Sequence, residues 1–232
     1  MKFGLFLIFF VSFAEAYQLP VTLGDSTVII SKIHHGPGKS FVHLHQNEAT
    51  ALKAALSVVH SEGGSVLTLV HSGERNIVFH LENNRYEFDP NRIFTDVGIK
   101  KTLTQFGSYS LQAHAEVKKL STKIKTMLPE GKIIAVHNNQ SYSLKNYFPG
   151  QDLALDAKAL KVNDASHYRN FYLVTQSADY LRLKKMRFNS ILQAGSASDD
   201  GSLSVYLMGR TYVNVEAGYD QLAAQIHMLK YA

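Results

Sequence analysis

The 232-residue sequence contains neither cysteine nor tryptophan. Without cysteine, the chain can form no disulfide, no thiolate metal site and no cysteine nucleophile. It also lacks a strong cluster of charges of one sign. Lys+Arg exceed Asp+Glu by 24 − 19 = +5, and the densest basic run, residues 184–187, is short. Nucleic-acid-binding surfaces concentrate their basic residues more strongly, so we expect no nucleic-acid partner.

The one long apolar run lies at the start of the chain. Lys2 is followed by an almost wholly apolar stretch, residues 3–13, and then by Ala14, Glu15 and Ala16. This pattern is typical of a secretory signal peptide, and the stretch is shorter than the ~20 residues that span a bilayer. We predict a signal peptide over residues 1–16 and a secreted or periplasmic chain with no stable membrane insertion after cleavage. A buried N-terminal helix and an uncleaved anchor are the alternatives.

The rest of the chain alternates between strand and helix patterns, and 45% of all residues are apolar, enough for a sizeable core. Strands are predicted over residues 18–33 with a turn at 24–25, and over 40–45, 65–70, 76–81, 132–137, 171–175, 203–207 and 211–215. Helices are predicted over 48–60, 97–127 with a break near Gly107, 177–187 and 220–229. Residues 138–164 form a long polar segment. This alternation predicts one α/β domain, residues 17–232, with a mostly parallel or mixed sheet.

Three polar sites fall at the ends of predicted strands, where α/β sheets bind their ligands. His45 ends one strand and Glu48 begins the next helix, His137 ends a buried strand, and Glu216 follows another. Two histidines and one carboxylate leave an open position on a catalytic zinc, and a further glutamate beside it can accept a proton from water. His43 faces the same side of its strand as His45 and remains an alternative ligand. The alternative for Glu216 is that it is a surface carboxylate with no part in catalysis.

A fourth element, residues 85–94, places two arginines and an asparagine within eight positions: Arg85, Asn91 and Arg92. Arginine binds carboxylates with paired hydrogen bonds, and an asparagine can hold the second oxygen. The alternative is a surface turn capped by Asp89.

Together these elements resemble the zinc carboxypeptidase superfamily, most closely its aspartoacylase and succinylglutamate desuccinylase branch. The resemblance covers residues 40–220 in chain order. It includes the His-x-x-Glu of 45–48, the Arg-Tyr of 85–86 with the Asp-Pro-Asn-Arg of 89–92, the His-Asn of 137–138 and the Val-Glu-Ala-Gly of 215–218. It implies a three-layer αβα fold with a mixed, mostly parallel central sheet.

The resemblance also implies a role for each site residue. His45, Glu48 and His137 would bind Zn²⁺, and Glu216 would be the general base and later the proton donor. Arg92 would polarise the scissile carbonyl or help bind a carboxylate. The remaining substrate-binding residues would be Arg85, Asn91 and Asn138. Arg75 is a rival to Arg85, because the spacing from Arg85 to Arg92 is one residue shorter than in the deacylase branch.

These expectations define a zinc metallohydrolase that cleaves an amide bond next to a carboxylate in a peptide. The predicted export favours a peptide substrate, with cell-wall peptides as one candidate. Two alternatives remain open at this point. The chain could be an N-acyl-amino-acid deacylase with the same mechanism, or a non-catalytic peptide-binding protein on the same fold. The sequence indicates no oligomeric state.

Overall fold

The computed structural model describes residues 15–232. Apart from Glu15 and Ala16, which begin the first strand, the predicted signal peptide lies outside the described residues. The elements in chain order are β1(Glu15–Leu23), β2(Ser26–His35), β3(Lys39–His43), α1(Ala49–Glu62), β4(Gly64–Val70), β5(Ile77–Leu81), β6(Asn84–Phe88), η1(Pro90–Arg92), α2(Asp96–Phe106), α3(Leu111–Met127), β7(Ile133–Asn139), η2(Leu144–Tyr147), η3(Ala154–Asp156), β8(Ala157–Lys161), β9(Phe171–Val174), α4(Ser177–Lys185), β10(Ser190–Gln193), α5(Leu203–Tyr206), β11(Tyr212–Gly218) and α6(Leu222–Tyr231). None of the helices within residues 15–232 has the length and apolar character needed to cross a bilayer.

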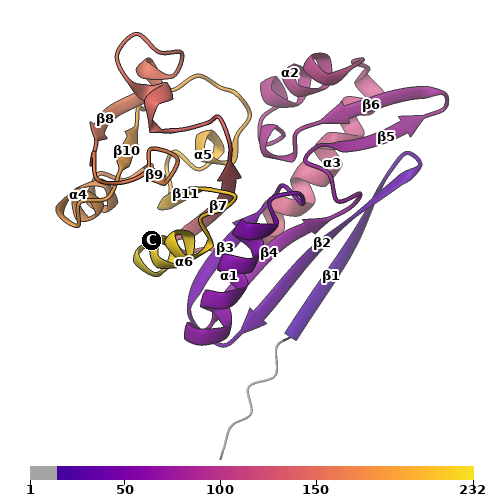
Figure 1. The fold of residues 1–232 in the computed structure, drawn as a ribbon. Coiled ribbons are helices and arrows are strands. Elements are labelled where there is room, and N and C mark those ends of the chain that lie inside the picture. The colour runs from indigo at the N-terminus through magenta and orange to yellow at the C-terminus, as the bar shows by residue number, and fades with distance from the viewer. Residues whose placement is uncertain (1–14) are drawn as a thin grey trace, which may run out of the picture.

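A nine-stranded sheet organises the fold, in the order β1-β2-β4-β3-β7-β11-β9-β10-β8 (Figure 1). The central strands β4, β3, β7 and β11 run parallel to one another. Towards the margins, β1 with β2, β2 with β4, β11 with β9, and β10 with β8 are antiparallel. The prediction of an α/β fold with a mixed sheet is therefore confirmed. Parallel central strands bring their carboxyl ends to one edge of the sheet, which is where ligands bind in such folds.

Apolar side chains fill both faces of this sheet. On one face, α1, α4 and α6 pack against the strands through a cluster that includes Ala51, Ala54, Val58, Tyr180, Leu183, Met228 and Leu229. On the other face, α2, α3 and the β5–β6 hairpin pack through a second cluster that includes Phe79, Phe88, Ile99, Leu103, Val117, Leu120 and Ile124. Residues of β7 and β11 alternate between the two clusters. The polar side chains at the ends of these strands therefore also alternate between the two faces of the sheet.

Two predicted elements are corrected by the structure. Residues 203–207 alternate like a strand, but Leu203–Tyr206 form the short helix α5. The Ser202 hydroxyl accepts from the Val205 amide, and the Asn91 side chain accepts from the Leu203 amide at 3.1 Å, which together favour a helical start. The predicted polar segment 138–164 contains the edge strand β8, and β10 follows α4 without having been predicted.

A close backbone contact fixes the segment that precedes α5. A Cβ atom added to Gly98 would lie 2.2 Å from the Cα of Gly201, so neither position has room for a side chain. Gly201 also has φ +77°, a conformation that favours glycine. The Gly201 carbonyl accepts from the Phe94 amide at 2.9 Å. Gly201 and its neighbours are thereby held beside η1 and the first turn of α2.

Candidate metal centre

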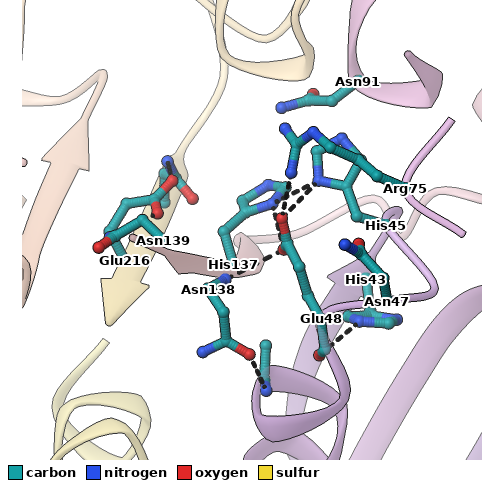
Figure 2. A network of polar contacts seen from close by, with 12 residues as sticks. His43, His45, Asn47, Glu48, Arg75, Asn91, His137, Asn138, Asn139 and Glu216 are labelled. Carbon is teal, nitrogen blue, oxygen red and sulfur yellow. Dashed lines mark hydrogen bonds and ion pairs between the residues drawn. The ribbon is translucent and has the colours of Figure 1, made fainter. Parts of the chain in front are cut away.

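Three side chains that are far apart in the sequence meet at the edge of the sheet (Figure 2). His45 Nδ1 lies 2.9 Å from Glu48 Oε1 and 3.2 Å from His137 Nδ1. His137 Nδ1 lies 3.0 Å from Glu48 Oε2. All three residues are almost fully buried, so their donor atoms face one another and have little contact with bulk solvent.

Local structure explains this convergence. The β3 strand ends at His43, and a tight turn, in which the Glu48 amide donates to the His45 carbonyl at 3.0 Å, leads into α1. Glu48 is the residue immediately before α1, and His137 lies in the parallel strand β7 next to β3. The backbone amide of Asn138 donates to Glu48 Oε2 at 3.0 Å, which fixes the carboxylate against β7.

The donor set fits a zinc ion. Two ligands at about 2.0–2.1 Å from a tetrahedral zinc lie about 3.3 Å apart, and the distances between the three side chains are close to this value. Two imidazole nitrogens that face each other at 3.2 Å cannot both carry a proton, but both can bind one cation. Two histidines and a carboxylate also match the ligand types that zinc prefers in catalytic sites. The buried His45–Glu48–His137 group therefore fits a metallohydrolase.

Asp89 supports this group, a role that the sequence reasoning missed. Its Oδ1 accepts from His45 Nε2 at 2.7 Å and from the Asn91 amide at 2.7 Å. A carboxylate on the remote nitrogen of an imidazole fixes its tautomer and directs the other nitrogen to a metal. The sequence showed Asp89 only as the cap of a turn, and it caps η1 as well. The signal that could have identified it is an aspartate that follows a strand directly, two residues before Asn91.

The charges of the group are strongly coupled. Burial lowers the pKa of His45, but the carboxylates of Asp89 and Glu48 outweigh this effect and raise it to about 9. Burial likewise opposes ionisation of Glu48, yet His45 and His137 hold its pKa well below the usual range. The group thus holds a proton among its donor atoms, and a bound metal would displace that proton.

Asp89→Asn is expected to weaken metal binding 10–100-fold, the usual effect of losing such an outer partner. An asparagine can present its amide nitrogen to His45 Nε2 and so favour the wrong tautomer. Competition with a chelator measures the affinity. Asp152→Asn, at an exposed position in the 140–156 segment, is the matched control and should leave the affinity unchanged. Equal affinities in both variants would contradict the role of Asp89.

His43 and His45 have different contacts. His43 Nδ1 lies 2.9 Å from Thr68 Oγ1, and Nε2 lies 3.1 Å from the Glu48 carbonyl oxygen. His43 is fully buried, and this burial lowers its pKa to about 4. It is therefore a core histidine that holds the backbone at Glu48, whereas His45 joins His137 and the Glu48 carboxylate.

Glu216 lies in the same cavity, on the strand next to His137. β11 and β7 are parallel with Glu216 opposite His137, so both side chains lie on one face of the sheet. The Glu216 carboxylate accepts from Asn139 Nδ2 at 3.1 Å and from Asn214 Nδ2 at 3.0 Å. The cavity has a volume of about 600 Å³, within the range of small-molecule sites.

The two rival arginines occupy different places. Arg75 donates to Glu48 Oε1 at 2.6 Å and approaches Asp89 Oδ2 at 3.3 Å. Its loop is tied to the β3–α1 turn, because Gln46 Oε1 accepts from the backbone amides of residues 71 and 73. Arg85 instead lies on the exposed β5–β6 hairpin, pairs with Glu87 and does not line the cavity. The structure therefore brings Arg75, and not Arg85, to the metal group.

Arg92 and Asn91 line the cavity. Arg92 is half-exposed there, with Nη1 3.5 Å from Asp200 Oδ2. Asn138 also lines the cavity. Its side chain accepts from the Ala51 amide at 2.7 Å and donates to Gln225 Oε1 at 2.9 Å, so it also joins α1 to α6. Substrate binding by Asn138 stays a prediction.

No protein-family model matches this chain, and no curated protein sequence matches it. Its structure is similar to that of an aspartoacylase family protein from Mesorhizobium loti. The two chains are 12% identical with a TM-score of 0.44, and the match covers 96% of this chain and 66% of that one. This chain therefore spans about two thirds of its length. The candidate metal site rests on the contacts of His45, Glu48 and His137.

Proposed function

We propose that the protein is a zinc-dependent hydrolase that cleaves an amide bond next to a carboxylate in a peptide. The observation that carries this proposal is the convergence of His45, Glu48 and His137, with Glu216 beside them in one cavity. We further propose that the helices on the two faces of the sheet make it a three-layer αβα domain over residues 17–232. Residues 1–16 support export to a secreted or periplasmic location.

His45, Glu48 and His137 would hold the zinc, with Asp89 orienting His45. When bound, zinc supplies a water of lowered pKa and polarises a carbonyl oxygen. Glu216 faces the same cavity and would accept a proton from the attacking water and return it to the leaving amine. Its two amide donors, Asn139 and Asn214, hold the carboxylate in place.

The arginines would bind the carboxylate of the substrate. Arg75, Asn91 and Arg92 line the cavity, and Figure 2 shows Arg75 and Asn91 above the metal group. Guanidinium groups in a partly desolvated site bind carboxylates through charge-assisted hydrogen bonds. An N-acyl amino acid also carries such a carboxylate, and a binding protein would need the arginines without Glu216. The deacylase alternative therefore predicts turnover of N-acyl amino acids, and the binding-protein alternative predicts no turnover.

The proposal is tested by measuring zinc in the purified chain and then screening peptides and N-acyl amino acids for release of an amine. We expect about one zinc per chain and hydrolysis of peptides with a free carboxylate. Hydrolysis of N-acyl amino acids alone would favour the deacylase. Zinc with binding but no hydrolysis would favour the binding protein, and no zinc after reconstitution would overturn the proposal.

Arg92→Ala is expected to raise KM for carboxylate-bearing substrates about 10–100-fold, because one charge-assisted hydrogen bond contributes about 1.5–3 kcal/mol. The matched control is Arg85→Ala, an arginine of the same motif that lies outside the cavity. Steady-state kinetics on a peptide and on its C-terminal amide separates the roles. If Arg85→Ala raised KM and Arg92→Ala did not, the assignment of the carboxylate site would be wrong.

A further inference from the structure

The cavity extends well beyond the metal group. Its floor is one face of β7, β11, β9 and β10, and the lining residues there include Asn139, Asn214, Leu173 and Gln193. Three strand spacings of about 4.8 Å separate β7 from β10, so this floor is about 14 Å wide. Figure 1 shows β8, β9 and β10 on one side of β7 and β11, with β5, β6 and α2 on the other.

The charged groups at the two ends of the cavity are paired differently. Arg75, which pairs with Glu48 and Asp89, and Arg92, which approaches Asp200, lie at the end near β5 and α2. At the β10 end of the floor, Asp156 lies beside Gln193, because the Asp156 carbonyl accepts from the Ala194 amide at 2.8 Å. Asp156 Oδ1 accepts from the Ser198 amide at 2.9 Å, and within residues 15–232 the carboxylate forms no ion pair. Asp156 is therefore an uncompensated negative charge that lines the cavity.

Hydrogen-bond acceptors lie along the floor towards this end. Asn139 Oδ1, Asn214 Oδ1 and Gln193 Oε1 are buried, and no group in the described part of the chain donates to them. The residues are 5%, 8% and 5% exposed. Asn139 and Asn214 direct their NH₂ groups to Glu216, which fixes their carbonyl oxygens as the free ends. Unpaired buried acceptors are costly, so this floor fits a ligand that is rich in N–H donors.

The tyrosines beside this end are consistent with its negative charge. Tyr147 lines the cavity, and its hydroxyl contacts that of Tyr142. Burial raises the pKa of Tyr147 more than the hydrogen bond with Tyr142 lowers it, and the carboxylates of Glu216, Asp156 and Asp200 raise it further. Tyr147 therefore stays neutral and adds no competing negative charge at the cavity wall.

We propose that Asp156 and Gln193 form a subsite for a protonated amino group, so that the substrate is an extended zwitterionic peptide. Its carboxylate lies at the arginines and its ammonium group at Asp156, with backbone N–H groups over Asn139 and Asn214. At 3.3–3.6 Å per residue, about four residues span the floor. This inference rests on the proposed hydrolase function and specifies its substrate class.

The test compares di-, tri-, tetra- and pentaalanine with their N-acetylated counterparts on the zinc-loaded protein. We expect kcat/KM for free tetraalanine to exceed that of the acetylated peptide on the order of tenfold. Asp156→Asn should bring this ratio close to one, mainly through KM, and Gln193→Glu should raise it. Asp152→Asn, on the same segment but exposed and outside the cavity, should leave it unchanged.

The outcomes separate the two proposals. Equal hydrolysis of free and acetylated peptides would overturn the amine subsite and leave the hydrolase intact. If no peptide is hydrolysed, calorimetric titration with tetraalanine and acetyl-tetraalanine decides the subsite by binding alone. Tighter binding of the free peptide, lost in Asp156→Asn but kept in Asp152→Asn, would then support the subsite without catalysis. Equal binding, or none, would overturn it.

Discussion

His45→Ala and His137→Ala are each expected to lower zinc affinity by more than about a hundredfold and to abolish turnover. Each variant removes one of the three side chains proposed to hold the zinc, a larger loss than the 10–100-fold typical of an outer partner. In the free protein, each change also leaves the buried Glu48 carboxylate without one of its imidazole partners. Elemental analysis after dialysis, together with a chelator titration, measures the effect.

The control for these variants is His34→Ala, because His34 lies on β2 and is exposed. It should keep about one zinc per chain and full activity. Thermal unfolding of the metal-free proteins shows whether each variant still folds. Stoichiometric zinc in both His45→Ala and His137→Ala would mean that the metal lies elsewhere.

Glu216→Gln is expected to keep zinc and to lower kcat by about 10²–10⁴, the usual contribution of a general base. Glutamine has nearly the same shape but cannot accept the proton. One of its two amide neighbours must also rotate, since Asn139 and Asn214 both donate to the carboxylate. Asn214 Oδ1 has no donor in the described part of the chain, so its side-chain amide can rotate and accept from the new NH₂ group.

Single-turnover kinetics with zinc content measured on the same sample tests this role. Glu130→Gln, an exposed glutamate outside the cavity, is the control. Retained zinc with lost turnover would distinguish a catalytic role for Glu216 from a structural one. Unchanged turnover would exclude Glu216 as the base and favour a water or another carboxylate of the cavity.

The fold was predictable where periodicity was strong. The helix predicted over residues 48–60 corresponds to α1, and the break near Gly107 separates α2 from α3. Short elements were not predictable, because their conformation depends on distant partners. Leu203–Tyr206 has a strand-like pattern, but Asn91, far away in the sequence, accepts its first amide hydrogen. β10 has four residues, too few for a period to be recognised.

In the candidate site too, features set by the local sequence pattern were predictable, and features set by distant contacts were not. Its metal group was predictable because His45 and Glu48 come just after the parallel strand β3 and His137 lies near the end of β7, and parallel strands bring such ends together. The choice between Arg75 and Arg85 was not predictable, because it depends on a loop that hydrogen bonds to Gln46 hold against the turn before α1. The role of Asp89 beside His45 was not predictable for a similar reason. A sequence shows its local capping bond to Asn91, whereas its contact with His45 exists only after η1 packs against the β3–α1 turn.

The contact between Gly98 and Gly201 has a consequence for how the enzyme would discriminate peptides by length. Residues 194–202 contact Asp156 through the Ser198 amide and approach Arg92 through Asp200. The backbone contact between Gly98 and Gly201 holds them against α2, together with hydrogen bonds from Thr95 and Lys101 to Asp199. Close-packed backbone does not adapt as a flexible lid does. The separation of the two charged ends is then a constant of the scaffold, and selection among substrates would depend on the fixed spacing of their terminal charges.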